Sequence, residues 1–209
     1  MRLELPKLYP ITDARLSGLS HAEQVALLAD GGATFVQLRE KRLSPREFYR
    51  EAEAALSVAR ARGVRLIIND RVDVALALQA DGVHLGQDDL PPEAARRLLG
   101  KRAIIGLSTH NLEQAREAAH QPVDYIAIGP IFPTSSKDNP DPVVGLEGLR
   151  RVHEASGSVP LVAIGGINSE NARRTIDAGA DTVAVLSVLL VEPSRITVRT
   201  QELLNNLQG

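Results

Sequence analysis

The feature that most constrains the fold is a regular alternation of short apolar runs and longer amphipathic segments along the whole chain. The apolar runs predict strands at 8–11, 34–38, 65–68, 82–85, 103–107, 125–128, 160–164 and 182–186. The amphipathic segments predict helices at 21–30, 45–62, 71–79, 91–99, 112–120, 146–154, 170–178 and 193–207. Strands that alternate with helices form right-handed βαβ units on a parallel sheet.

Eight such pairs in 209 residues predict an α/β fold, a single (β/α)₈ TIM barrel that spans 1–209 as one catalytic domain. The alternative is an open doubly wound sheet, although no glycine-rich dinucleotide turn follows the first strand. Three helix starts carry a capping side chain in the sequence, namely Ser44, Asn111 and Ser169.

Composition excludes several classes of protein. The net charge is −2 with both signs mixed, so a nucleic-acid surface of clustered Lys and Arg is not expected. With no cysteine, disulfides and thiolate metal sites are excluded. No apolar run approaches the roughly 18 residues of a membrane span, and the first residues lack a signal-peptide core, so we expect a cytoplasmic protein. The oligomeric state is left open, a homo-oligomer included.

A barrel of this type carries its active site at the carboxyl ends of its strands, so polar residues there are informative. Along the second strand, Val36 and Leu38 share one face, which suits the helix layer. Gln37, Arg39 and Lys41 share the opposite face, which predicts a seat for a polyanion inside the barrel mouth. The alternative is that both cations pair with acids at the surface.

Two carboxylates follow neighbouring strands. Asp70 ends the third strand after Asn69, and Asp89 follows the fourth. Adjacent strands lie about 4.8 Å apart, so both carboxylates could reach one cation. Oxygen ligands favour Mg²⁺, which takes one or two carboxylates and completes its shell with phosphate and water. Aspartate is also a common cap and turn residue, and His84 is expected to be a satisfied core histidine.

A second group of residues suits phosphate. Gly165 and Gly166 follow the seventh strand and Ser187 the eighth, where these barrels repeatedly bind phosphate. Ser108 follows the fifth strand and could donate to a phosphate or begin the next turn.

A long connection of roughly 15 residues follows 125–128 and contains Thr134, Ser136 and Lys137. It predicts a binding loop or lid, with a solvated surface loop as the alternative. The chain lacks a Cys nucleophile and an obvious Ser-His-Asp set. The residues therefore indicate a metal-assisted reaction between a diphosphate ester and a second, phosphorylated substrate.

Several of these stretches, in order along nearly the whole chain, together resemble the thiamin phosphate synthase family. They are Leu8-Tyr9 through Thr12-Asp13, Gln37-Leu38-Arg39-Glu40-Lys41, Asn69-Asp70, Gly82-Val83-His84-Leu85-Gly86-Gln87-Asp88-Asp89, Gly129-Pro130-Ile131-Phe132-Pro133-Thr134, Gly145-Leu146-Glu147-Gly148-Leu149 and Ala163-Ile164-Gly165-Gly166-Ile167.

That family couples 4-amino-2-hydroxymethyl-5-methylpyrimidine diphosphate to 4-methyl-5-(2-hydroxyethyl)thiazole phosphate, which gives thiamin phosphate and pyrophosphate. The resemblance implies Mg²⁺ on Asp70 and Asp89. It implies that the pyrimidine diphosphate is bound by Gln37, Arg39, Lys41, Asn69, Ser108 and Lys137, of which Arg39, Lys41, Ser108 and Lys137 act in catalysis. It implies that the thiazole phosphate is bound by Thr134, Ser136, Gly166, Leu186 and Ser187.

The chain departs from the family pattern at two places. Ser136 stands where a threonine is expected, and 187–190 is bulkier than expected. A thiazole tautomerase relative should lack the two aspartates and carry a histidine in place of Pro130. A sugar-phosphate isomerase barrel would not explain Asp70 with Asp89, and a sensor of thiamin phosphates would bind without turnover.

Overall fold

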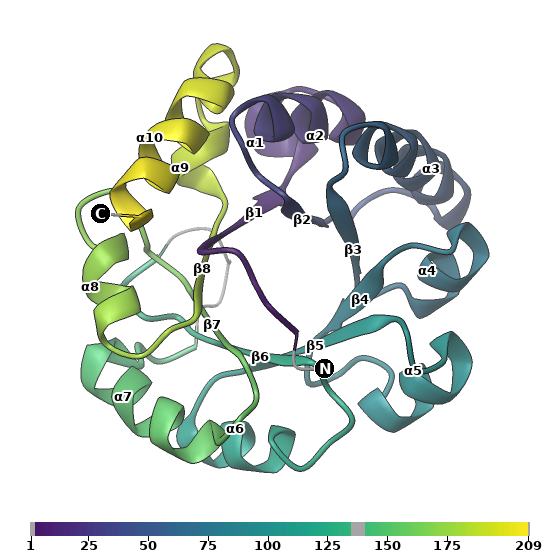
Figure 1. Ribbon diagram of the computed structural model, residues 1–209. Helices are drawn as coiled ribbons and strands as arrows, with labels where there is room; N and C mark the ends of the chain where they lie inside the picture. The colour runs from purple at the N-terminus through teal and green to yellow at the C-terminus, as the bar shows by residue number, and fades with distance from the viewer. Residues whose placement is uncertain (1–2, 135–140, 209) are drawn as a thin grey trace.

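The chain folds into a closed barrel of eight parallel strands surrounded by helices, as Figure 1 shows. The computed structural model describes residues 3–134 and 141–208. The strands are β1 (Leu8–Thr12), β2 (Phe35–Leu38), β3 (Arg65–Asn69), β4 (Gly82–Leu85), β5 (Ile104–Thr109), β6 (Tyr125–Ile128), β7 (Leu161–Ile164) and β8 (Thr182–Val185). Each pairs with the next, and β1 pairs with β8 to close the ring. The predicted fold class is confirmed.

The helices lie outside the ring and differ from the expected ranges mainly at their ends. They are α1 (Ala14–Ser17), α2 (His21–Asp30), α3 (Pro45–Ala61), α4 (Val72–Leu78), α5 (Pro92–Leu99), α6 (Leu112–Ala118), α7 (Gly145–Ser156), α8 (Ala172–Asp177), α9 (Ser187–Leu190) and α10 (Ile196–Gln208), with a 3₁₀ turn at Pro193–Arg195. The short helices α1 and α9 were not predicted, because one turn is too short to show a 3.6-residue period.

Two of the three predicted caps are confirmed. The Ser44 side chain accepts from the Glu47 N–H in a capping box, and the Asn111 side chain accepts from the Gln114 N–H. The third was wrong, since α8 begins at Ala172 and its N-terminus lacks a side-chain cap. The Asn168 carboxamide oxygen accepts from the backbone N–H groups of the two residues before that helix, which holds this stretch in a turn.

Side chains alternate between two apolar layers. Val36 and Leu38 belong to the layer between sheet and helices, as the pattern of β2 predicts. Tyr9, Phe35 and Tyr125 belong to a second cluster inside the barrel, against which residues of the segment before β1 also pack. The amino-terminal half of the barrel is therefore filled, and the opening lies at the carboxyl ends of the strands.

Among the described residues, no helix combines the length and apolar character that crossing a membrane would require.

Candidate active site

A cavity of about 1170 Å³ opens at the carboxyl ends of the strands. This volume lies just above the usual range of about 300–1,000 Å³ for small-molecule sites, so two small substrates can share it. The predicted site residues that the structure describes all line it, namely Gln37, Arg39, Lys41, Asn69, Asp70, Asp89, Ser108, Thr134, Gly166, Leu186 and Ser187. Ser136 and Lys137 lie outside the described residues.

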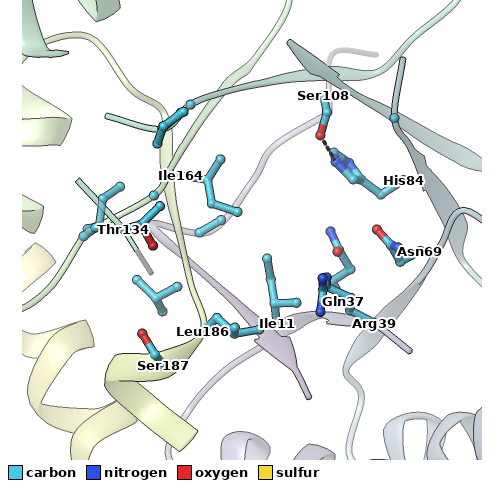
Figure 2. A pocket seen from close by; sticks show the side chains of 18 of the residues that line it. Ile11, Gln37, Arg39, Asn69, His84, Ser108, Thr134, Ile164, Leu186 and Ser187 are labelled. Atoms are coloured by element: carbon cyan, nitrogen blue, oxygen red, sulfur yellow. Dashed lines mark hydrogen bonds between the residues drawn. The ribbon is translucent and has the colours of Figure 1, made fainter. Parts of the chain in front are cut away.

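The cavity has two sides (Figure 2). Gln37, Arg39, Asn69, His84 and Ser108 lie together on one side. The opposite side carries Thr134, Leu186 and Ser187, and the apolar side chains of Ile11 and Ile164 lie between the two groups. The residues predicted for the two binding regions thus lie on two sides of one cavity, and the binding of a substrate by each side stays a prediction.

Both cations that follow β2 are paired with carboxylates. Lys41 Nζ lies 2.5 Å from Asp70 Oδ2, and Arg39 Nη1 lies 3.1 Å from Asp13 Oδ2. The alternative prediction, that both cations pair with acids, is therefore correct. Arg39, Lys41 and Asp70 nevertheless also line the cavity. Asp13 additionally caps α1 by accepting from the backbone N–H groups of Arg15 and Leu16. The short helix therefore fixes the carboxylate that orients Arg39.

Asp70 and Asp89 approach each other, as their strand positions predict. The backbone N–H of Asp70 donates to the His84 carbonyl over 2.8 Å, and Asp70 adopts a left-handed conformation with φ 63°. A non-glycine residue rarely adopts this conformation, and such residues concentrate at functional sites. Asp89 Oδ2 accepts from the Gly86 N–H over 2.6 Å.

The carboxylate pair perturbs the pKa of one of its members. Burial raises the pKa of Asp89, and the adjacent Asp70 carboxylate raises it further, against the opposing effect of the Gly86 N–H. A site with two close carboxylates favours a bound cation, because the cation removes their repulsion. In the described ranges no cluster of three or more His, Asp or Glu side chains forms a complete metal site.

Asn69 carries an unsatisfied donor. Its side-chain amide nitrogen Nδ2 is buried and lacks a hydrogen-bond partner in the described part of the chain. Asn69 is 6% exposed and lines the cavity. A buried donor without a partner costs about 1–3 kcal/mol, so a ligand acceptor at this position would recover that free energy.

The Gly165-Gly166 pair has a structural reason to lack side chains. Both residues have positive φ, and a Cβ would lie 2.6 Å from Pro130 Cα at Gly165 and 2.5 Å from the Pro133 carbonyl oxygen at Gly166. The sequence pattern predicts that these glycines allow a ligand to approach closely, whereas in the structure the β6–α7 connection makes the close approach. Hydrogen bonds from the Ile131 and Phe132 N–H groups hold that connection against β7.

Sequence reasoning missed that His84 lines the cavity and that its ring bonds to Tyr125 inside the barrel. His84 is buried, as expected of a core histidine, and burial lowers its pKa to about 4. Its ring, however, lines the cavity and bonds to Ser108, as Figure 2 shows. Alternation along β1 and β6 places Tyr9 and Tyr125 inside the barrel, which was the available signal.

Comparison with known proteins gives a consistent result. The family model for thiamine monophosphate synthase matches residues 8–189. The thiamine-phosphate synthase of Koribacter versatilis is 51% identical over 198 residues, which cover 91% of this chain and 92% of the relative. The corresponding protein of Chloroflexus aurantiacus is 49% identical over 185 residues, covering 88% and 85%.

A solved structure agrees with these relatives. The thiamine phosphate pyrophosphorylase of Pyrococcus furiosus superimposes with a TM-score of 0.87 at 40% identity, covering 97% of this chain and 95% of that one. The sequence match and the fold therefore agree over nearly the whole barrel, and the chain belongs to the thiamine monophosphate synthase family.

Proposed function

We propose that the chain transfers the pyrimidine-methyl group of 4-amino-2-hydroxymethyl-5-methylpyrimidine diphosphate to 4-methyl-5-(2-hydroxyethyl)thiazole phosphate, with release of pyrophosphate. The observation that carries the proposal is one cavity with a charged side and a second, separate side. The first side combines a carboxylate pair, two cations and an unsatisfied amide donor. The names of the relatives support the same reaction.

The donor set of the first side fits Mg²⁺. Asp70 and Asp89 supply oxygen ligands, and Mg²⁺ binds readily through two carboxylates plus substrate phosphate. When bound, the ion would neutralise charge on the diphosphate leaving group. Asp70 and Asp89 would hold the ion, and Lys41 would then turn from Asp70 toward the diphosphate.

The remaining steps use side chains of this chain. Arg39 and Lys41 would stabilise the negative charge that gathers on the leaving pyrophosphate. The methylene C–O bond breaks with its electron pair on pyrophosphate, and the lone pair of the thiazole nitrogen then forms the new C–N bond. The reaction needs no protein nucleophile, and Ile11 and Ile164 would keep an apolar boundary around the cationic pyrimidine-methyl group.

The second side would hold the thiazole phosphate. Thr134, Gly166, Leu186 and Ser187 line it, and Ser136 remains a prediction of the resemblance. Lys137 likewise remains a prediction for the pyrimidine diphosphate. Cytoplasmic placement and a homo-oligomeric state also stay predictions.

The two other activities differ from this one in a measurable way. A tautomerase would convert a thiazole isomer without any pyrimidine substrate, and a sensor would bind thiamin phosphates without turnover. The pair Asp70 and Asp89 has no role in the tautomerase, which favours the transferase.

The experiment combines both substrates with the purified protein and identifies the product by mass spectrometry. The expected result is that the wild type forms thiamin phosphate and Asp70→Asn does not, while the thermal midpoint of Asp70→Asn is no lower than that of the wild type, because asparagine tolerates the left-handed backbone of this position. Conversion of a thiazole isomer alone would replace the transferase with the tautomerase. Binding of thiamin phosphates without any product would favour the sensor.

A further inference from the structure

A continuous line of polar groups crosses the interior of the barrel beneath the cavity. Gln37 Nε2 donates to Tyr9 Oη over 3.1 Å, and Tyr9 Oη lies 2.9 Å from Tyr125 Oη. Tyr125 Oη lies 2.9 Å from His84 Nδ1, and His84 Nε2 lies 2.9 Å from Ser108 Oγ. The line thus links β2, β1, β6, β4 and β5, and its two ends, Gln37 and Ser108, line the cavity.

The hydrogen atoms can be distributed along this line in one direction. Because the Gln37 amide nitrogen only donates, Tyr9 Oη accepts there and its own hydrogen goes to Tyr125. Tyr125 then donates to His84 Nδ1, so the imidazole proton is on Nε2 and is donated to Ser108 Oγ. In the reverse order Tyr9 Oη would accept from both Gln37 Nε2 and Tyr125 Oη, and the buried Tyr9 hydroxyl hydrogen would have no acceptor in this line.

The barrel is built to hold this line in place. Tyr9 and Tyr125 are each 1% exposed or less, and their hydroxyls would be costly to bury without partners. The rings of His84 and Tyr125 stack at 14°, with centroids 5.5 Å apart. A Cβ at Gly106 would lie 2.0 Å from Tyr125 Cζ, so the glycine on β5 makes room for the ring.

We propose that Tyr9, Tyr125 and His84 are positioning residues that make the Ser108 hydroxyl a hydrogen-bond donor to the substrate. Ser108 Oγ accepts from His84, so its single hydrogen is directed to a ligand. The atom that receives this hydrogen is therefore an acceptor, such as a phosphate oxygen or a ring nitrogen of the substrate. This inference rests on the proposed role of Ser108 in the first binding side.

The direction of the line has a direct readout, the tautomer of His84. An imidazole nitrogen that carries a hydrogen differs in ¹⁵N chemical shift from one that does not. The substrate-free protein, labelled with ¹⁵N at its five histidines, therefore reports the tautomer of His84. The His84 signals are assigned as those missing from His84→Asn. We expect the Nε2–H form in the wild type.

Tyr9→Phe interrupts the line without touching His84 or Ser108. Tyr125 then loses the donor that fixes its orientation, and we expect a measurable fraction of His84 to change to the Nδ1–H form. Because Ser108 then faces the substrate as a donor only part of the time, kcat/KM for the pyrimidine diphosphate should fall about threefold to tenfold. KM for the thiazole phosphate should stay unchanged.

Tyr49→Phe is the matched control, because Tyr49 lies on α3 and its hydroxyl bonds to Glu53 at the surface. It should leave the tautomer and both kinetic constants unchanged. An Nδ1–H tautomer of His84 in the wild type overturns the proposal. Because this result comes from the wild-type spectrum alone, it tests the proposal even if Tyr9→Phe fails to fold. A Tyr9→Phe protein with the wild-type tautomer also overturns it.

The tautomer of His84 and the transferase activity are measured independently, so one of the two proposals can fail while the other holds. If the Nε2–H form is found but no thiamin phosphate is made, the reaction assignment fails and the direction of the line stands.

Discussion

Asp89→Asn should raise the thermal stability of the protein and lower its activity. The asparagine keeps an oxygen acceptor for the Gly86 N–H but removes the charge beside Asp70. A carboxyl whose pKa is raised on folding stabilises the fold below its unfolded pKa, and this contribution is lost as the pH rises through the folded pKa. The ionised form of Asp89 is therefore a destabilising charge in the metal-free protein.

The size of the effect follows from the local charges. Two unit charges about 4 Å apart repel by about 4 kcal/mol at an effective dielectric constant near 20. Contact of Lys41 with Asp70 and partial exposure to water reduce this repulsion, which leaves on the order of 1 kcal/mol. For a protein of this size, that gain raises the thermal midpoint by about 2–4 °C.

Activity should change in the opposite direction. Loss of one of the two proposed Mg²⁺ ligands removes several kcal/mol of charge stabilisation, so kcat/KM should fall at least about 100-fold. Thermal melts with and without Mg²⁺ give the second readout, since an ion that binds the folded state raises the midpoint. We expect this rise in the wild type and its loss in Asp89→Asn.

Asp88→Asn is the control, because Asp88 is the exposed neighbouring carboxylate. It should keep the magnesium-dependent rise in midpoint. A metal-free Asp89→Asn protein that melts below the wild type, or one that retains magnesium-dependent turnover, would refute the reasoning.

Three further predictions concern single residues. The pKa of His84 is lowered to about 4 in the folded protein, so at intermediate pH the unfolded chain takes up a proton that the folded chain does not. The free energy of unfolding should therefore fall by about 3 kcal/mol as the pH drops from about 6.5 toward 4. Urea unfolding of His84→Asn should show a smaller fall over the same pH range. Asn69→Leu removes the unsatisfied amide, so its thermal midpoint should not drop, while KM for the pyrimidine diphosphate should rise about tenfold; a large loss of stability would show that Asn69 has a structural role. Lys137→Ala should impair turnover more than binding of thiazole phosphate, measured by calorimetry, and equal losses would move Lys137 to the thiazole side.

The sequence predicted the barrel because its signals were local and repeated. The alternation of β2 assigned Val36 and Leu38 to the helix layer and Gln37 to the cavity, and the structure has each there. The proximity of Asp70 and Asp89 followed from their positions after neighbouring strands. These inferences needed only the side-chain period of a strand and the order of strands in a barrel.

Contacts between distant segments could not be predicted in the same way. The bond between Tyr9 and Tyr125 joins residues 116 positions apart, and no local pattern gives that pairing. Ser169 failed as a cap because a competing side chain, Asn168, takes the free N–H groups of the turn. The close packing of Pro130 and Pro133 on Gly165 and Gly166 likewise depends on the path of a long connection.

Pyrophosphate release from the pyrimidine diphosphate, measured with and without thiazole phosphate and Mg²⁺, tests the transferase most directly. The account predicts release that requires Mg²⁺ and equals the amount of thiamin phosphate formed when both substrates are present. Release that is independent of Mg²⁺, or that proceeds without formation of thiamin phosphate when both substrates are present, would contradict it.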